Sequence, residues 1–127
     1  MDMRFISTKI QGALDYLVGL ALILAPMLFG FQDVGGAAVF VPVALGAALI
    51  VYSLLTRYEW GVLKLLSMTY HLALNVAVGV LLILSPFLFG FINEVPNTWV
   101  PHVVVGIVMI IVVLFSQTTS FTTTSEV

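Results

Sequence analysis

Four long apolar runs, separated by short polar segments, dominate the pattern of hydrophobic and polar positions along the chain. They cover residues 13–31, 37–55, 72–91 and 99–115, and Asp15 is the only one of the Asp, Glu, Lys and Arg residues inside them. A helix that crosses a bilayer needs about 20 mostly apolar residues. Barrel strands would instead alternate apolar and polar positions over about ten residues. The pattern therefore predicts an all-α, polytopic membrane protein with four transmembrane helices.

The composition agrees with this prediction and excludes several classes of function. Of the 127 residues, 61% are hydrophobic and 8% are charged, against roughly 45–50% and about 25% in typical soluble proteins. The absence of cysteine excludes disulfides and thiolate metal sites. Four basic residues are too few for a nucleic-acid-binding patch. We expect membrane lipids as the surroundings, no nucleic-acid partner and no metal or other cofactor.

The distribution of charge predicts the orientation of the helices. The four basic residues precede the first run or lie between the second and the third: Arg4, Lys9, Arg57 and Lys64. The other two loops contain Asp33 and Glu94 and no basic residue. The positive-inside rule then places both termini in the cytoplasm. A cleaved signal peptide is the less favoured reading of the first run, because Asp15 interrupts it and a counterpart follows later in the chain.

Residues 22–31, LILAPMLFGF, recur as LILSPFLFGF at residues 82–91, 60 positions later. The same shift aligns further positions without a gap, such as Gly46 with Gly106. The chain therefore reads as a tandem duplication of a two-helix unit. Because each unit has an even number of spans, both have the same orientation, as in parallel repeats related by an axis along the membrane normal. We expect a four-helix bundle with a pseudo-two-fold axis in that direction.

The duplication also sets the expected boundaries. They are residues 1–60 for repeat 1, with helices at about 10–31 and 37–56; residues 61–117 for repeat 2, with helices at about 63–91 and 98–116; and residues 118–127 for a Ser/Thr-rich, disordered tail.

The repeated decapeptide has the chemistry of a helix end. Its positions of interest are Ala25, Pro26 and Gly30 in the first copy and Ser85, Pro86 and Gly90 in the second. Each proline removes a backbone donor and ends or kinks a helix, and the Ser85 hydroxyl can partly satisfy the carbonyl that is freed. Each glycine permits the following turn. A helix-ending device copied by duplication is favoured over a ligand site.

Two copies of a two-helix unit, each with Leu-Ile-Leu, then Ala-Pro-Met or Ser-Pro-Phe, then Gly-Phe, resemble the SPW-repeat family. The resemblance covers nearly the whole chain outside the termini, although neither copy retains the tryptophan of the family's Ser-Pro-Trp tripeptide. It implies a small integral protein of a bacterial or archaeal cytoplasmic (inner) membrane. It implies no reaction, because the family has no catalytic residues to carry over.

Two polar residues and a glycine, spaced by four, recur at equivalent positions of the first and third expected helices, and this spacing puts each stripe on one helix face. They are Gln11, Asp15 and Gly19 in the first helix, and His71, Asn75 and Gly79 in the third. Small residues allow helices to approach closely and polar residues hydrogen-bond across them, so we infer that the stripes face each other. Gly46 and Gly106 offer close-packing surfaces on the second and fourth helices.

Asp15 is the most informative single residue, because a charge within a span costs about 2.5–3.5 kcal/mol at the bilayer centre and less near the interface. One hypothesis is a proton or cation site formed by Asp15, His71 and Asn75. The favoured alternative is a hydrogen-bonded polar clamp, or an aspartate that reaches cytoplasmic water near Lys9.

Other aromatic and histidine residues are expected at the membrane interfaces. Tyr52 and Tyr70 fall near the cytoplasmic interface and Trp99 near the outer one, as interfacial anchors do. His102 follows Pro101 at the expected start of the fourth helix and reads as an interfacial histidine. No metal-binding histidine pair, paired carboxylates or Ser-His-Asp arrangement is visible.

Three functions remain after these observations. The first is a structural or interaction module, either a homo-oligomer or a subunit beside a membrane-protein partner. The second is a small transporter or channel, or a lipid- or quinone-binding protein, that uses the polar stripe. The third is an intramembrane enzyme, which the short list of reactive residues disfavours. We therefore expect the first and no enzymatic reaction.

Overall fold

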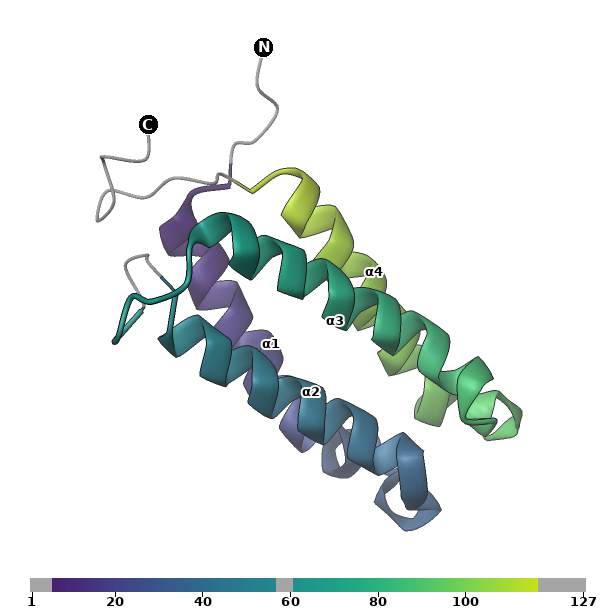
Figure 1. The fold of residues 1–127 in the computed structure, drawn as a ribbon. Helices are drawn as coiled ribbons and strands as arrows, with labels where there is room; N and C mark the ends of the chain where they lie inside the picture. Colours follow the sequence, from purple (N-terminus) through teal and green to yellow (C-terminus); the bar gives the residue numbers. More distant parts are fainter. Residues whose placement is uncertain (1–5, 57–60, 117–127) are drawn as a thin grey trace.

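The structure, a computed structural model, describes residues 6–56 and 61–116. Within these ranges it contains four long helices: α1 (Thr8–Leu28), α2 (Gly36–Leu54), α3 (Met68–Leu88) and α4 (Pro96–Leu114) (Figure 1). Short 3-10 helices, η1 (Gln32–Val34) and η2 (Phe91–Asn93), connect α1 to α2 and α3 to α4. The all-α prediction is confirmed. The expected tail at residues 118–127 lies outside the described residues.

The largest difference from the expected boundaries is at the start of α3, which begins at Met68 and not near residue 63. The side chain of Ser67 caps this helix by accepting a hydrogen bond from the backbone N–H of Tyr70, at 3.3 Å. The preceding segment is held elsewhere, because the N–H groups of Leu65 and Leu66 both donate to the carbonyl of Leu55 at 2.7 Å. These bonds return the chain to the end of α2 before the new helix can start.

The repeated decapeptide ends α1 and α3 and turns the chain. Pro86 has no N–H for the carbonyl of Leu82, and the hydroxyl of Ser85 donates to that oxygen at 2.9 Å. Gly30 and Gly90 follow in the left-handed region, with φ of +73° and +79°. Only glycine adopts this region without strain, so the helix end depends on the glycine as well as on the proline.

Glycine pairs bring the two helices of each hairpin into close contact. A Cβ atom at Gly46 would lie 2.5 Å from the carbonyl oxygen of Gly19, and one at Gly106 would lie 2.5 Å from that of Gly79. Real Cβ atoms do not approach oxygen so closely, so a larger residue would push the backbones apart. The hairpins α1–α2 and α3–α4, which lie side by side in Figure 1, therefore have the same construction.

Two backbone contacts join the hairpins at the end opposite η1 and η2. The N–H of Ile6, just before α1, donates to the carbonyl of Phe115, just after α4, at 2.9 Å. The N–H of Leu66, just before α3, donates to the carbonyl of Leu55, just after α2, at 2.7 Å. The two bonds are equivalent under the 60-residue shift. The segments that enter and leave each hairpin are therefore tied to those of the other hairpin in the same way.

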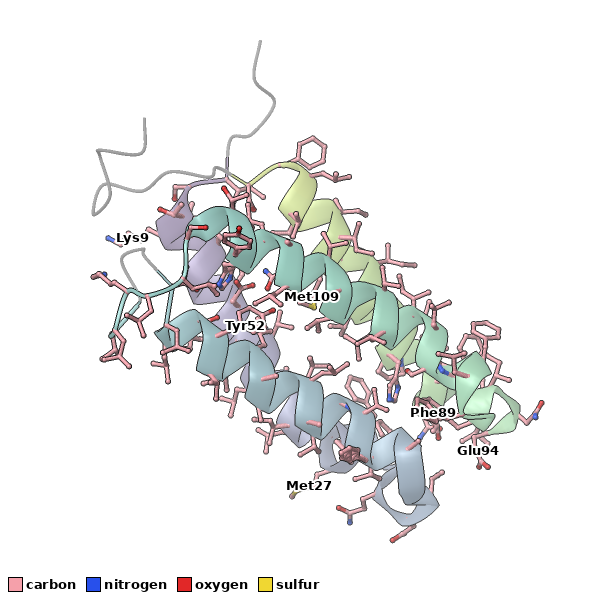
Figure 2. The ribbon with its side chains drawn as sticks, viewed as in Figure 1. Lys9, Met27, Tyr52, Phe89, Glu94 and Met109 are labelled. Carbon is pink, nitrogen blue, oxygen red and sulfur yellow. The ribbon has the colours of Figure 1, made fainter. Side chains whose placement is uncertain are left out.

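The interior between the hairpins is apolar over its middle part. The members of this core come from all four helices: Leu22, Leu49, Tyr52, Val78, Leu82 and Met109. Figure 2 shows Met109 and Tyr52 pointing into the space between the helices. Several of these positions match under the repeat shift, such as Leu22 with Leu82, which means that the duplicated units contribute equivalent core residues.

The outer surface of the described helices is also apolar. All four helices are long and apolar enough to cross a membrane, with mean hydropathies of 1.6, 2.2, 2.0 and 2.1 in chain order. Less than half of each span is buried inside the protein, and exposed residues include Leu17 and Phe40, each 64% exposed. A surface of this kind is stable in contact with lipid and not with water. The fold is that of an integral membrane protein.

Candidate functional site

The polar stripe of α1 is organised around a buried carboxylate. Gln11 and Asp15 lie one helical turn apart, and the side-chain nitrogen of Gln11 donates to both carboxylate oxygens at 2.9 Å. Asp15 is 4% exposed and Gln11 is 1% exposed. The carboxylate therefore lies within the protein and does not reach water along the side of α1.

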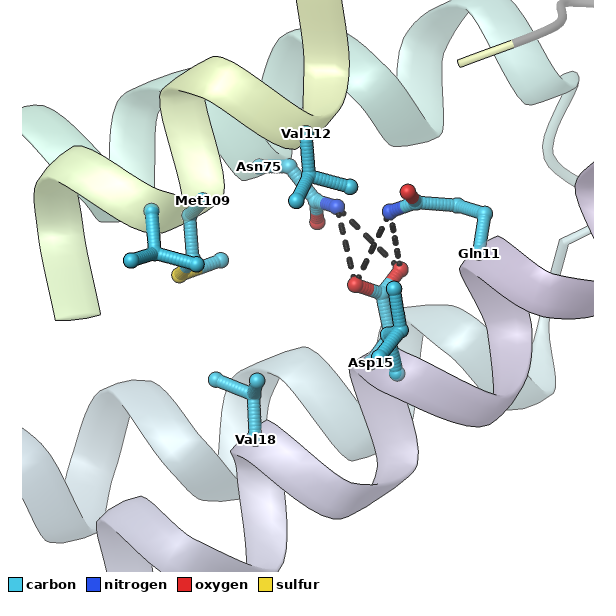
Figure 3. Close-up of a pocket in the computed structure, with 8 residues that line it drawn as sticks. Gln11, Asp15, Val18, Asn75, Met109 and Val112 are labelled. Carbon is cyan, nitrogen blue, oxygen red and sulfur yellow. Dashed lines mark hydrogen bonds between the residues drawn. The ribbon is translucent and has the colours of Figure 1, made fainter. Parts of the chain in front are cut away.

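The stripe of α3 meets Asp15 from the other hairpin. Nε2 of His71 makes a direct contact with Oδ2 of Asp15, and Nδ2 of Asn75 donates to both carboxylate oxygens at 3.1 Å. His71 is completely buried and Asn75 nearly so. Figure 3 shows the amide groups of Gln11 and Asn75 converging on the Asp15 carboxylate. The structure thus brings together all four polar residues that the sequence singled out.

Three further residues complete this cluster, and the sequence analysis did not assign them to it. The hydroxyl of Tyr52, on α2, donates to Oδ1 of Asn75. Thr56 Oγ1 lies 2.7 Å from Nδ1 of His71, and Ser116 Oγ donates to Oε1 of Gln11 at 2.7 Å. We call these seven residues the polar cluster: Gln11, Asp15, Tyr52, Thr56, His71, Asn75 and Ser116.

Two of these additional residues, Thr56 and Ser116, could have been found from the 60-residue shift. Thr56 matches Ser116 under the shift, just as Gln11 matches His71. A hydroxyl therefore bonds the equivalent side chain in each half. Tyr52 has no such signal, because its equivalent is Val112, and it was expected at the cytoplasmic interface. That expectation is wrong: Tyr52 is 9% exposed, and its ring meets the ring of His71 edge-on at 5.0 Å.

The hydrogen-bond partners limit where the protons of the cluster can be. Thr56 Oγ1 lies 2.6 Å from the Tyr52 carbonyl and has only one hydrogen. If that hydrogen goes to the carbonyl, Nδ1 of His71 donates to Thr56, and a second proton lies between Nε2 and Asp15. If it goes to Nδ1, the neutral imidazole donates from Nε2 to the carboxylate. In both arrangements a hydrogen lies between Nε2 of His71 and the Asp15 carboxylate.

A small cavity of about 50 Å³ lies beside the cluster. Its lining comes mainly from α1 and α4: Gln11, Leu14, Asp15, Val18, Asn75, Val108, Met109 and Val112 (Figure 3). The difference between the repeats accounts for its position. Tyr52 reaches Asn75 from α2, whereas the shorter side chain at the equivalent position of α4, Val112, leaves space. The cluster is therefore asymmetric although its backbone framework is duplicated.

A second buried polar group lies toward the η1 and η2 end, where His102 was expected to be interfacial. That expectation is wrong, because α4 begins at Pro96 and His102 is 1% exposed. Its ring lies between those of Phe31 and Phe91, with centroid separations of 5.6 and 4.7 Å. These phenylalanines are the final residues of the two decapeptides, and both point inward.

His102 compensates for a proline in the other hairpin. Pro42 has no N–H for the carbonyl of Ala38, four residues earlier in α2. Nε2 of His102 lies 3.2 Å from that carbonyl oxygen and can donate to it. His102 and Pro42 are equivalent positions of the two repeats. The second repeat therefore has a histidine that can donate to the Ala38 carbonyl, and the first repeat has at the equivalent position the proline that leaves this carbonyl without its helical donor.

The remaining predicted residues serve the framework. Gly19, Gly46, Gly79 and Gly106 lie at the contacts within the hairpins. Among the described residues no group of three His, Asp or Glu side chains is placed to hold a metal ion.

Four apolar helices in two like hairpins, clamped by a buried polar cluster, define a polytopic helical membrane protein built from an internal repeat. A model of the SPW repeat domain matches residues 9–116, which is most of the chain. The protein belongs to the SPW repeat family. No curated protein and no solved structure matches the chain.

Proposed function

We propose that this SPW repeat protein is a structural or interaction module of the membrane, working as a homo-oligomer or beside a membrane-protein partner. The observation that carries the proposal is that the Asp15 carboxylate is buried and already bound by side chains of the protein. Its carboxylate, 4% exposed, accepts from Gln11 and Asn75 and contacts His71. A residue that loads and releases an ion must exchange partners with water, whereas a clamp keeps them.

The proposed arrangement in the membrane places the pseudo-two-fold axis along the membrane normal and both termini in the cytoplasm of the cell. The equivalent ties of Ile6 to Phe115 and of Leu66 to Leu55 support the axis. The orientation rests on the basic residues, which precede α1 or lie between α2 and α3. In this arrangement the polar cluster lies toward the cytoplasmic side, and η1 and η2 lie at the outer side of the cytoplasmic membrane.

The test is native mass spectrometry of the full chain, extracted gently from its own membrane, with cross-linking in the intact membrane beforehand. The proposal expects a discrete oligomer or a stoichiometric protein partner, retained in the Asp15→Asn variant if that variant folds. Only single chains in both measurements would overturn it. Asn93→Asp, which changes an exposed amide outside the cluster, is the matched control.

A second candidate is proton transport, or binding of a lipid or quinone, at the polar cluster. The direct contact of Asp15 with His71 and the cavity of about 50 Å³ beside them, which is large enough to hold water, favour proton transport. Internal repeats and an intramembrane acid are features of transporters. Proton flux into liposomes by the purified protein, abolished by Asp15→Asn and kept by Asn93→Asp, would place this candidate first.

The proposal includes no enzymatic reaction. Asp15, His71 and Thr56 form a carboxylate–imidazole–hydroxyl chain, which in hydrolases activates a nucleophile. Here the Thr56 hydroxyl is fully buried and lies 2.6 Å from the Tyr52 carbonyl. A nucleophile must reach its substrate, and this hydroxyl is instead bonded at a helix end. The geometry supports a structural role for these three side chains.

A further inference from the structure

An apolar groove runs between the two hairpins on their α2–α3 side, toward the η1 and η2 end. It has a volume of about 320 Å³. Its walls come from both helices: Ala37, Phe40, Val41, Ala44, Leu45, Leu81, Ser85, Leu88 and Phe89. The hydroxyl of Ser85 is occupied by the carbonyl of Leu82, so the walls offer a guest only apolar contact. In a membrane protein such a groove faces the acyl chains of lipids.

A second hollow, of about 220 Å³, lies next to the groove at the η1 and η2 end. The two spaces share Ala37 and Phe89, and the second is lined by loop residues at the end of the bundle: Val34, Gly35, Gly36, Ala38, Gly90, Phe91 and Glu94. Figure 2 shows Phe89 and Glu94 together at this end. An apolar slot that continues into a mouth of backbone and carboxylate groups has the form of a site for an amphiphile.

A difference between the repeats explains why this mouth is open. On the α1–α4 side, Nδ2 of Asn97 donates to the carbonyl of Phe29 at 2.6 Å and ties the two hairpins together. The equivalent residues on the α2–α3 side are Ala37 and Phe89. Alanine cannot donate, and within the described residues no other side chain takes that place on the Phe89 carbonyl. The Phe89 carbonyl therefore lacks a side-chain donor like the one that Asn97 gives to the Phe29 carbonyl.

The space around the adjacent glycines shows the same difference. A Cβ at Gly30 would have Nδ2 of Asn97 at 4.0 Å, whereas a Cβ at Gly90 would meet no described atom within 4 Å. The mouth therefore has room for a group from outside the chain beside the Phe89 carbonyl. A guest that donates a hydrogen bond there would replace the missing amide.

The negative charge at this end of the bundle favours some hydrogen-bond-donating headgroups over others. Glu94 lines the mouth, Asp33 lies in the neighbouring loop, and neither loop has a Lys or Arg. An anionic headgroup would be repelled, and an ammonium group would be attracted to Glu94 while it donates to the carbonyl. We propose that the groove binds one membrane lipid of the phosphatidylethanolamine class, with an acyl chain in the slot and its ammonium group at Phe89 and Glu94.

The experiment is native mass spectrometry of the full chain, delipidated in mild detergent and offered equal amounts of phosphatidylethanolamine and phosphatidylglycerol. The proposal expects one retained lipid per chain, with the amine lipid preferred. Glu94→Gln should reduce that preference by about two- to fivefold, the range of an exposed ion pair, without abolishing retention. Equal retention of both lipids by the unchanged protein would overturn the choice of headgroup.

Two variants test the place of binding. Ala37→Asn installs at the open mouth the amide that Asn97 supplies on the other side, and it should lower retention of the amine lipid about two- to tenfold, the range of one hydrogen bond. Ala44→Phe should fill the slot and abolish retention of either lipid. Val104→Phe, the same aromatic change at the equivalent position of α4, is the control and should retain the lipid. Unchanged retention in Ala37→Asn, or equal loss in Val104→Phe, would overturn the assignment. Ala37 lines the mouth and is only partly buried, and its equivalent in the other repeat is already an asparagine, so this variant keeps the test valid even if Ala44→Phe does not fold.

Discussion

Exchanging Asp15 and Asn75 tests whether the polar cluster is governed by pairing across the two hairpins. The positions are equivalent under the 60-residue shift, and Nδ2 of Asn75 lies 3.1 Å from both oxygens of the Asp15 carboxylate. Asp15 also has a partner one turn earlier on its own helix, Gln11, and Asn75 accepts from Tyr52 on α2. We consider Asp15→Asn alone, Asn75→Asp alone, and both changes together.

The expected losses of stability follow from charge and hydrogen bonding. Asn75→Asp alone places a second carboxylate beside Asp15, and two like charges about 4 Å apart repel by about 4 kcal/mol at an effective dielectric constant of about 20. Uptake of a proton relieves part of this cost. Asp15→Asn alone removes a charged acceptor. A hydrogen bond to a charged group contributes about 1.5–3 kcal/mol in water-soluble proteins and interhelical bonds in membranes average about 0.6 kcal/mol, so we expect about 1–2 kcal/mol.

The double exchange restores one carboxylate opposite one amide. His71 precedes position 75 by one turn, as Gln11 precedes position 15, so a donor on the same helix remains available to the moved carboxylate. We expect a loss below about 1 kcal/mol, smaller than that of either single change, because most of the direct pairing is re-formed.

The assay is reversible unfolding of the full chain in mixed micelles by increasing SDS, followed by helical circular dichroism. Asn93→Asp makes the same chemical change at an exposed position and should stay within about 0.5 kcal/mol of the unchanged protein. The reasoning is refuted if the double exchange is as unstable as Asn75→Asp, or if its loss equals the sum of the two single losses.

Two further predictions use the same unfolding assay. Gly46→Ala and Gly106→Ala should each cost about 1–3 kcal/mol by overpacking against a facing backbone, despite a gain in helix propensity of about 0.5–1 kcal/mol; a net stabilisation in either would contradict the close contact. His102→Ala should cost about 1–3 kcal/mol because the Ala38 carbonyl loses its donor. Adding Pro42→Ala should recover part of this loss by returning a backbone N–H, and no recovery would show that the imidazole does not serve that carbonyl.

The sequence predicted the parts of the site that follow from helical periodicity and duplication. Gln11 and Asp15 share a face because they are four residues apart, and the repeat shift places His71 and Asn75 on the equivalent face of α3. A polar group inside an apolar span needs a partner, so the inference that the two faces meet followed from chemistry. The helix-end role of Ser85 could be predicted for a similar reason, since a proline in a known register frees a known carbonyl.

The contributions from α2 and α4 could not be predicted in this way. These helices are apolar around most of their circumference, so periodicity does not fix which side faces inward. Tyr52 then looked like an interfacial anchor, although its hydroxyl reaches Asn75. His102 depended on where α4 begins, and Pro96 starts the helix earlier than the apolar run suggested. Pro42 shows that the Ala38 carbonyl lacks its helical donor, but nothing in the sequence shows which side chain of another helix supplies one.

The two equivalent backbone hydrogen bonds at the end of the bundle opposite η1 and η2 have a consequence for the order of the helices along the chain. Ile6 meets the segment after α4 in the way that Leu66 meets the segment after α2. A linker of the same length as residues 57–65 could therefore connect Ser116 to Ile6, and the chain could be opened between Thr56 and Leu66. Such a circular permutant would run α3, α4, α1, α2 and keep every contact between the helices. The two halves are thus interchangeable in sequence order, and only the side chains that differ between them distinguish the first from the second.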